Sequence, residues 1–423
     1  RQATIVIQDA ATILFNSWHD TLSATLFNLS SLFNRYVLLV VIASFIFVLW
    51  GLRMRNKNTE NVVVKNYRRW RNEALVLGIS ILFLGPLPIW LIGKAIMTHK
   101  NQMAATRFGF ASMLGAALIF VVIIEYFVSN RDKANILLAL LVSLSIGVHL
   151  NNANAYEKSW SKQVDFYQQF ALRVPDLEEN TAIVAAQEIL PAMGEYPTAY
   201  ALNLIYSNSE RQQEANYWFY AIYSSFASRM GQFLDGIPLD EDFLLTEFHG
   251  NSKEIIFVSY EPGSKQCLWV LRPEDSNLRL ISELERSMSL NSALDRIDIH
   301  ANSATLLPTD IFNMDTPNNW CSYYQRADLA RQRGEWQEIT ALWEEAQISK
   351  KIPGNGFEYI PFIEGYAHMQ DWAQVKKLTK ASNKVSLGMY HILCPTLGNI
   401  EETTSVSIER DATIEDLRDY LKC

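Results

Sequence analysis

Four apolar runs, separated by short charged connections, dominate the first 150 residues of the chain. They cover Tyr36–Leu52, Ala74–Gly93, Phe108–Asn130 and Ala134–Leu150. Each run has about the 17–25 residues that a helix needs to cross the core of a bilayer. The pattern therefore predicts an α-helical bundle with four transmembrane spans over residues 36–150.

The charges between these runs predict how the bundle is oriented. The first connection carries seven cations against Glu60 and Glu73. The cations are Arg53, Arg55, Lys57, Lys65, Arg68, Arg69 and Arg71. Loops rich in lysine and arginine remain in the cytoplasm. Because four crossings return the chain to its starting side, residues 1–35 and everything after residue 150 are expected outside a bacterial cell membrane.

Glycine and proline interrupt the second run at Gly85-Pro86-Leu87-Pro88. Neither proline has a backbone N–H, so the hydrogen-bond ladder of a helix must be disturbed there. One interpretation is a broken helix that lines a cavity. The other is a kink at the end of the membrane segment, with Trp90 in the interfacial aromatic belt. We favour the kink.

The third run contains one charged residue, Glu125. An ionisable residue inside a span is a functional candidate. Glu125 is also only about a turn and a half of helix from Arg131 and Lys133, which this topology places in the cytoplasm. We favour an ion pair at the membrane edge.

The residues before the first run have a different pattern. Apolar side chains recur at steps of three and four over residues 8–34, among polar residues such as His19 and Asp20. This spacing is typical of an amphipathic helix. We expect residues 1–35 to form an outward segment that lies on the membrane surface or packs on helices outside this sequence.

After the fourth run the chain becomes polar, and an extracytoplasmic α/β domain is predicted over residues 151–310. Tyr156–Arg173 is expected to extend the fourth helix out of the membrane. Short apolar or β-branched runs bounded by turn residues predict strands. These runs are Thr181–Ala186, Tyr217–Phe226, Lys253–Tyr260 and Gln266–Leu271. The run Asp240–Asp242 fits either a cation site or the start of a helix, and we favour the helix.

Residues 311–423 have the pattern of helical hairpins. Small and large apolar residues between Tyr323 and Ala346 fall at the spacings of a tetratricopeptide repeat, and a degenerate copy follows Ile360. A TPR-like helical domain is predicted. Its aromatic residues are the candidates for an interaction surface with a protein partner. These candidates are Tyr323, Trp336, Trp343, Tyr366 and Trp372.

Charge and cysteines narrow the function of the outward region. Residues 151–423 hold 23 Lys and Arg against 39 Asp and Glu, which disfavours nucleic acid as a partner. All four cysteines lie there, where an oxidising compartment permits disulfides. We expect a disulfide between two of Cys267, Cys321 and Cys394, with the terminal Cys423 as the candidate free thiol. No motif for a metal ion or cofactor is recognised, so none is predicted.

Three segments together resemble a known family. They are Trp160–Pro175, the run Ala201-Leu202-Asn203 with Tyr206, and Pro361–Ala367. They are similar to large polytopic, glycosyltransferase-like proteins of Chloroflexota, with the C-type architecture of the dolichyl-phosphate-mannose protein mannosyltransferases. The resemblance implies that this chain is the C-terminal portion of such a protein. In that class the catalytic acid lies in the first outward loop, and no residue here matches it. Arg107 occupies a membrane-edge position where the family has an acid before the arginine, and this chain has Thr106.

Two functions therefore compete. The first is an accessory or scaffolding membrane protein whose outward domain binds another protein or an envelope component. The second is a glycosyltransferase-like enzyme, or its C-terminal part, that uses a lipid-linked sugar donor at the outer leaflet. We favour the first, because interaction features are present while catalytic residues are not identified.

Overall fold

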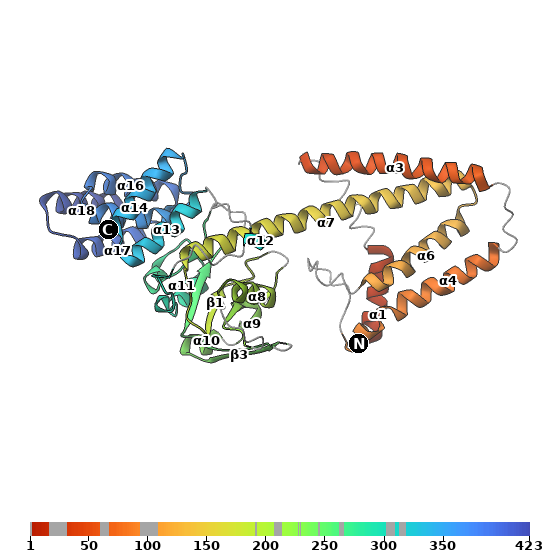
Figure 1. Ribbon diagram of the computed structural model, residues 1–423, viewed down its shortest axis with the longest axis horizontal. Helices are drawn as coiled ribbons and strands as arrows, with labels where there is room; N and C mark the ends of the chain where they lie inside the picture. Colours follow the sequence, from red (N-terminus) through yellow and green to blue (C-terminus); the bar gives the residue numbers. More distant parts are fainter. Residues whose placement is uncertain are drawn as a thin grey trace. The chain divides into compact units, whose positions relative to one another are not determined.

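The computed structural model describes most of the chain (Figure 1). The described residues are 2–16, 32–59, 67–93, 109–190, 193–206, 214–226, 228, 230–243, 246–261, 266–301, 309–312 and 319–423. They fall into two compact units, Arg1–Lys158 and Ser159–Cys423.

All the secondary-structure elements in the described residues of the first unit are helices. Its elements are α1 (Gln2–Ala11), the π-helix η1 (Thr12–Asn16), α3 (Leu32–Thr59), α4 (Tyr67–Leu84), α5 (Leu87–Leu91), α6 (Phe110–Phe127) and the first part of α7 (Arg131–Arg173). Within the described residues, three helices are long and apolar enough to cross a membrane: Phe33–Met54, Phe110–Phe127 and α7. The chain thus has the helices of a membrane protein.

The predicted second span differs from the other three. Its residues are divided between α4 and α5, because the helix ends at Leu84 and starts again after Pro86. The amides of Ile89 and Trp90 bond to the carbonyl oxygen of Pro86, as expected at a new helix start. The interruption expected from the prolines is present, and a membrane crossing by this segment stays a prediction.

Small residues let α4 and α6 pack closely. A β-carbon added to Gly115 would lie 2.6 Å from the backbone oxygen of Gly78 and 2.6 Å from the amide nitrogen of Leu82. Close backbone approach at small residues is typical of helix packing in membranes. The α1 helix also joins this bundle, because Trp90 Nε1 of α5 donates to Asp9 Oδ2 at 2.8 Å, with both side chains buried.

Some expectations for the first unit fall outside the described residues. These are the amphipathic pattern over residues 17–31 and the membrane-edge residues Thr106 and Arg107. Glu125 lies near the end of α6 and is half-buried. The next residue, Tyr126, has its ring 4.9 Å from the guanidinium carbon of Arg71 on α4.

The second unit begins with the polar half of α7 and a four-stranded sheet in the order β2-β1-β5-β6. The strands are β1 (Thr181–Ala185), β2 (Tyr217–Ala221), β5 (Ile255–Ser259) and β6 (Trp269–Val270). Strand β1 is parallel to β2 and β5, and β6 is antiparallel to β5. The four predicted strands are therefore present, with shorter bounds.

Alternate residues of this sheet enter two different cores, as the pleat of a strand requires. Ile183 and Phe219 point to one face, where α7 and α8 (Glu195–Tyr206) pack. Ala182 and Trp218 point to the other face, whose core continues into the C-terminal helices. Because both faces are covered, the strands read as continuous apolar runs.

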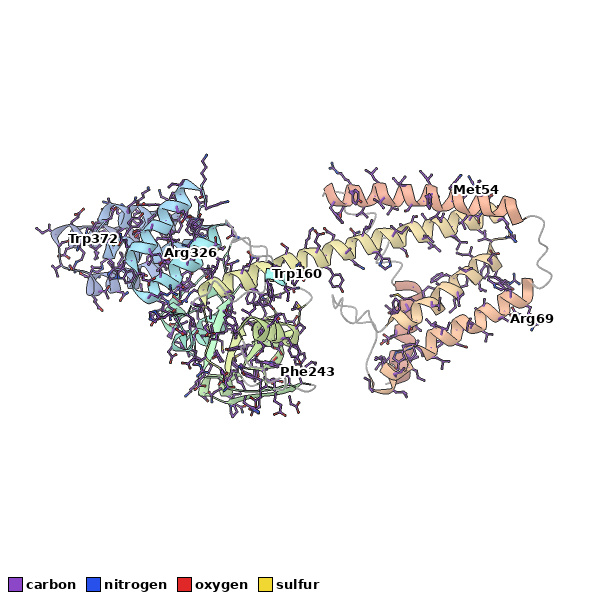
Figure 2. All side chains as sticks on the ribbon, viewed as in Figure 1. Met54, Arg69, Trp160, Phe243, Arg326 and Trp372 are labelled. Atoms are coloured by element: carbon purple, nitrogen blue, oxygen red, sulfur yellow. A yellow bond between two sulfur atoms is a disulfide. The ribbon has the colours of Figure 1, made fainter. Side chains whose placement is uncertain are left out.

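Two short hairpin strands, β3 (Pro238–Phe243) and β4 (Thr246–Asn251), lie beside the sheet (Figure 2, Phe243). Asp240 pairs in register with His249, and Asp242 with Glu247. The expectation of a helix start at Asp240–Asp242 was wrong, because a complementary strand follows within the next residues and pairs with them. Small helices complete this part: α9 (Ile222–Ser225), α10 (Met230–Asp235), η4 (Pro273–Asn277), α11 (Glu283–Ser289), η5 (Leu294–Arg296) and α12 (Thr309–Phe312).

Residues 319–423, all of them described, form six longer helices. They are α13 (Trp320–Arg333), α14 (Trp336–Ile348), α15 (Ile360–His368), α16 (Trp372–Val385), α17 (Tyr390–Thr403) and α18 (Ile408–Leu421), with the short η7 (Gly356–Tyr359) before α15. Each helix packs on its neighbour in sequence or on the next but one, which makes three stacked hairpins. The first two hairpins were predicted. The third, α17–α18, was not.

Candidate functional site

The most unusual feature of the second unit is a set of buried charges where the sheet meets the helical hairpins. Arg173, the last residue of α7, donates from Nε to Asp328 Oδ2 of α13 at 2.5 Å, and both side chains are almost fully buried. Arg331, one turn further along α13, bonds to the other oxygen of Asp328. The Nη1 atom of Arg331 also lies 3.8 Å from Glu364 Oε1 of α15. Asp328 thus joins α7 to α13, and Arg331 extends the network to Glu364 of α15.

The segment that leaves the sheet adds a third arginine to this network. Arg272 precedes η4, and its Nε lies 3.6 Å from Asp275 Oδ2. Burial alone would lower the pKa of Arg272, but the carboxylates of Asp275, Glu364 and Asp328 outweigh it and raise that pKa. Burial alone would raise the pKa of Asp328, yet the guanidinium groups around it lower that pKa to about 2. Asp328 is therefore ionised at neutral pH.

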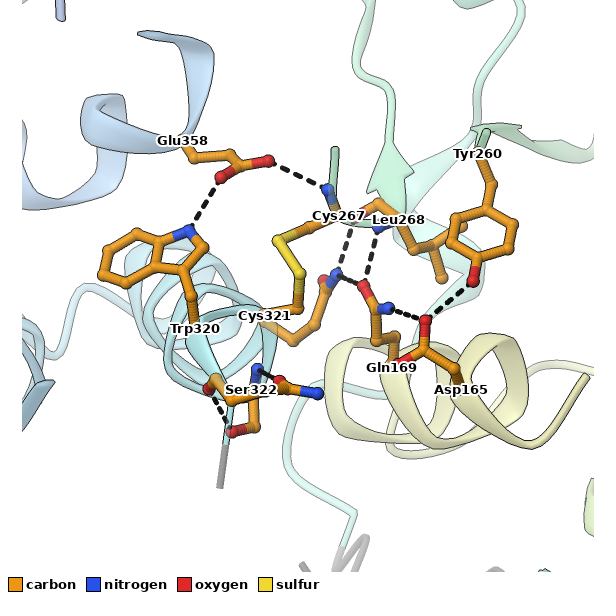
Figure 3. The surroundings of a disulfide bond; sticks show 11 residues. Asp165, Gln169, Tyr260, Cys267, Leu268, Trp320, Cys321, Ser322 and Glu358 are labelled. Carbon is orange, nitrogen blue, oxygen red and sulfur yellow. Dashed lines mark hydrogen bonds between the residues drawn. A yellow bond between two sulfur atoms is a disulfide. The ribbon is translucent and has the colours of Figure 1, made fainter. Parts of the chain in front are cut away.

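We call the region where the sheet meets the helical hairpins, around Arg173, Arg272 and Asp328, the joint. A disulfide also crosses this joint (Figure 3). Cys267, two residues before β6, is bonded to Cys321 of α13. The fully buried carboxylate of Glu358, in η7, accepts two hydrogen bonds beside it: one from the Cys267 amide at 2.9 Å and one from Trp320 Nε1 at 2.7 Å. Burial raises the pKa of Glu358 to about 7, although these bonds oppose the rise. One covalent bond and one carboxylate therefore tie the sheet edge to two helices.

Glutamine side chains link α7 to the same strand edge. Gln169 Oε1 accepts from the Leu268 amide at 2.7 Å and from Gln325 Nε2 at 3.2 Å. Gln325 Nε2 also donates to the Leu268 carbonyl at 2.6 Å. On its other side Gln169 donates to Asp165, which also accepts from the hydroxyl of Tyr260 at 2.7 Å. These bonds satisfy the backbone amide and carbonyl of Leu268, just before β6, which would otherwise be buried without partners.

Of the three segments from which a family resemblance was inferred, the first and third contribute to this joint, and the second packs on the first and on β2. From the first, Arg173 enters the charge network, and the carbonyl of Val174 accepts from the hydroxyl of Tyr206 in the second at 2.9 Å. The side chain of Asn203 bonds to the amide and the carbonyl of Tyr217, which fixes α8 against β2. From the third, Glu364 faces Arg331. A structural role in packing therefore accounts for the residues of these segments: Arg173, Asn203, Tyr206 and Glu364.

A glycine in the third segment has the same kind of role. A β-carbon added to Gly365 of α15 would lie 2.6 Å from Cγ2 of Ile339 on α14. Only glycine lets these two helices approach so closely. In contrast, a β-carbon added to Gly398 of α17 would meet no atom within 4 Å.

The aromatic residues expected to form an interaction surface lie mostly inside the helical hairpins. Tyr323, Trp343, Tyr366 and Trp372 are buried (Figure 2, Trp372), and Trp336 is half-buried and stacks on His368. As a surface, this prediction was wrong. Large apolar residues at these positions fill the space between helices, so the regularity that made them visible in the sequence reflects packing.

The cysteines form two disulfides, Cys267–Cys321 and Cys394–Cys423. A disulfide among the first three cysteines was expected, and Cys267–Cys321 is such a bond. The expectation of a free Cys423 was wrong, because α18 returns beside α17 and brings the end of the chain to Cys394.

A second group of polar residues lies at the carboxyl end of the parallel strands, where α/β sheets commonly bind ligands. Glu195, the first residue of α8, accepts from the Ala221 amide at 2.7 Å and from the Ser225 hydroxyl. Burial and the charge of Glu195 raise the pKa of Glu241 in β3. Burial and the same two carboxylates raise the pKa of Tyr220 in β2.

Exposed aromatic rings lie next to this carboxylate pair. Tyr196 and Tyr200 of α8 are exposed, and the ring of Tyr196 stacks on Phe243 with centroids 3.8 Å apart. The sequence did not single out these residues, because a glutamate and two tyrosines on a short helix have no distinctive spacing.

Comparison of this chain with known protein families, with curated proteins and with solved structures finds no match.

Proposed function

We propose that this chain is an accessory or scaffolding protein of a bacterial cell membrane, with four membrane spans and a rigid extracytoplasmic module that binds a protein or another envelope component. The observation that carries the proposal is the buried joint. Its charges, disulfide and glutamines hold the helical hairpins in one orientation on the sheet. A rigid surface of this kind favours binding, because its conformational entropy is already lost on folding and is not lost again when the partner binds.

The disulfides support an extracytoplasmic location for the module. Disulfides persist in oxidising compartments such as the periplasm or the cell surface and are rare in the cytoplasm. The cation-rich connection around Arg53–Arg71 supports the same orientation, since such loops remain inside.

The partner-binding surface is proposed on two adjoining loops of the helical hairpins. Four apolar side chains stand in or beside these loops, and we call them the loop edge: Ile348, Ile352, Val385 and Leu387. All are exposed, Leu387 to 92% and Ile348 to 83%. Ser386 of one loop bonds to the amide of Gly356 beside the other at 2.9 Å, so the two loops lie together. Clustered exposed apolar residues are typical of interaction sites.

An impermeant amine cross-linker applied to intact cells tests both location and partner. Lys350, Lys351 and Lys384 beside the loop edge supply amines. We expect a discrete adduct for the wild type, and its loss by about tenfold or more in the double variant Ile352→Asp/Leu387→Asp, because an aspartate at each of two apolar contacts costs well over 1.4 kcal/mol.

Val406→Asp is the matched control for this experiment. Val406 is 81% exposed in the turn between α17 and α18, outside the loop edge. Its adduct is expected to equal that of the wild type. An adduct that forms only after lysis contradicts the proposed orientation, and one that persists in the double variant contradicts the proposed surface.

A second candidate function, a glycosyltransferase-like enzyme that acts on a lipid-linked sugar, is favoured by the carboxylate pair. Glu195 and Glu241 with the exposed rings of Tyr196 and Tyr200 offer the hydrogen-bond acceptors and stacking surfaces that sugars use. We expect this role to require Glu241. The test measures transfer from a lipid-linked sugar donor. Transfer by the wild type that is lost in Glu241→Gln, with the fold intact, supports the enzyme. Equal transfer by both proteins contradicts a role for this carboxylate pair.

A further inference from the structure

A shallow depression between η4 and α11 stands apart from the joint, the carboxylate pair and the loop edge. It has a volume of about 460 Å³ and is lined by Ser276, Asn277, Arg279 and Arg286. The lining is mostly polar. All four side chains donate hydrogen bonds, and the two arginines have no acceptor atom to offer.

The two arginines retain free donors. Arg286 uses one guanidinium nitrogen to bond to the Ile281 carbonyl at 3.0 Å. Within the described part of the chain, no carboxylate pairs with Arg279 or Arg286. Among the nearest acids along the chain, Asp275 accepts from the Arg272 amide and Glu285 accepts from Ser259 and Ser282, whereas Glu283 is exposed.

The positive field of the depression comes from its two arginines. Burial, together with the nearby cation of Arg279, lowers the pKa of His391 of α17, so this imidazole adds no charge at neutral pH. The surrounding domain is strongly acidic, with 39 Asp and Glu after residue 150. A local gathering of unpaired cations in such a domain marks a place where an anion would be stabilised.

We infer that this depression binds a phosphate group. Guanidinium groups match phosphate oxygens in pairs of parallel hydrogen bonds, and the hydroxyl of Ser276 with the amide of Asn277 supplies donors for the remaining oxygens. The phosphate belongs to free inorganic phosphate or to a phosphomonoester. This inference is independent of the proposed function, because none of its residues belongs to the loop edge or the carboxylate pair.

Calorimetric titration of the full chain in detergent, at low salt, tests the inference. The probes are inorganic phosphate and glycerol 1-phosphate, which distinguish a free phosphate from an esterified one. We expect saturable binding of at least one probe with a Kd of about 1 mM or tighter. Each single variant, Arg279→Ala or Arg286→Ala, is expected to weaken it by about tenfold, and the double variant to abolish it.

Arg326→Ala is the control, because Arg326 is also an exposed arginine but lies on α13 (Figure 2). Its binding should equal that of the wild type. The inference is overturned if neither probe gives saturable heat, if the double variant binds as the wild type does, or if Arg326→Ala weakens binding as much as the depression variants do. Circular dichroism of each variant checks that the fold is retained.

Discussion

Replacing Asp328 by alanine is expected to lower the free energy of unfolding of the second unit by about 3–5 kcal/mol, the usual cost of removing one partner from a buried ionic network. Asp328 is the carboxylate that both Arg173 and Arg331 contact, and all three side chains are buried. Without it, two guanidinium groups remain buried with too little negative charge around them. The loss also removes the Arg173–Asp328 bond, one of the bonds that fix α7 on α13.

The midpoint of urea unfolding, followed by tryptophan fluorescence, measures this effect. Asp416→Ala is the matched control, because Asp416 is also an aspartate between two cations, Lys376 and Lys380, but on the exposed surface of α18. Surface ion pairs contribute little, so its midpoint should stay close to that of the wild type. Equal midpoints for the two variants would contradict the importance of the joint.

The same joint shows where prediction from the sequence reaches its limit. The strands could be predicted because buried parallel strands are continuous apolar runs, as in Thr181–Ala185. Arg173 and Asp328 could not be paired, because 155 residues separate them and neither has a distinctive neighbourhood. Arg173, Asn203 and Glu364 were noticed only as parts of motifs. The folded chain brings Arg173 and Glu364 into one charge network, whereas Asn203 fixes α8 against β2.

The helical hairpins could be predicted where their packing residues recur at regular positions in the sequence, and the hairpin without such a pattern was missed. The first two hairpins each have a tryptophan at the start of the second helix, Trp336 and Trp372. The third has no such marker, and Pro395 lies inside α17, which argues against a helix from sequence alone. The buried aromatic residues were mistaken for a surface because the repeat pattern identifies large side chains without saying which way they point.

Stability is expected to depend on pH through Glu358, which is fully buried beside the disulfide of the joint. Its pKa is about 7 in the folded protein against an ordinary value of 4.5. Because the folded state holds the proton more tightly, the stabilisation from this group is complete below about pH 4.5 and is lost as pH rises to 7. At 1.36 kcal/mol for each unit of pKa, the loss is about 3 kcal/mol.

The variant Glu358→Gln isolates this effect, because glutamine does not ionise. It carries a destabilising cost that is the same at every pH, since one of the two donors, the Cys267 amide or Trp320 Nε1, then faces an amide nitrogen. Because that cost does not change with pH, the ionisation of Glu358 is measured by how the difference between the free energies of unfolding of the two proteins changes with pH. Asp328 does not contribute to the difference, since its pKa of about 2 keeps it ionised across the window.

Unfolding midpoints measured from pH 4 to pH 8 for the wild type and for Glu358→Gln therefore test the burial of this carboxylate. We expect the free energy of unfolding of the wild type, minus that of Glu358→Gln, to fall by about 3 kcal/mol between pH 4.5 and 7 and then to remain level. Glu402→Gln, an exposed glutamate of α17, should follow the wild type throughout. A difference that is the same at pH 4.5 and pH 8 would mean that Glu358 ionises as it does in water, and that the sheet edge and the helices are not sealed against each other at the joint.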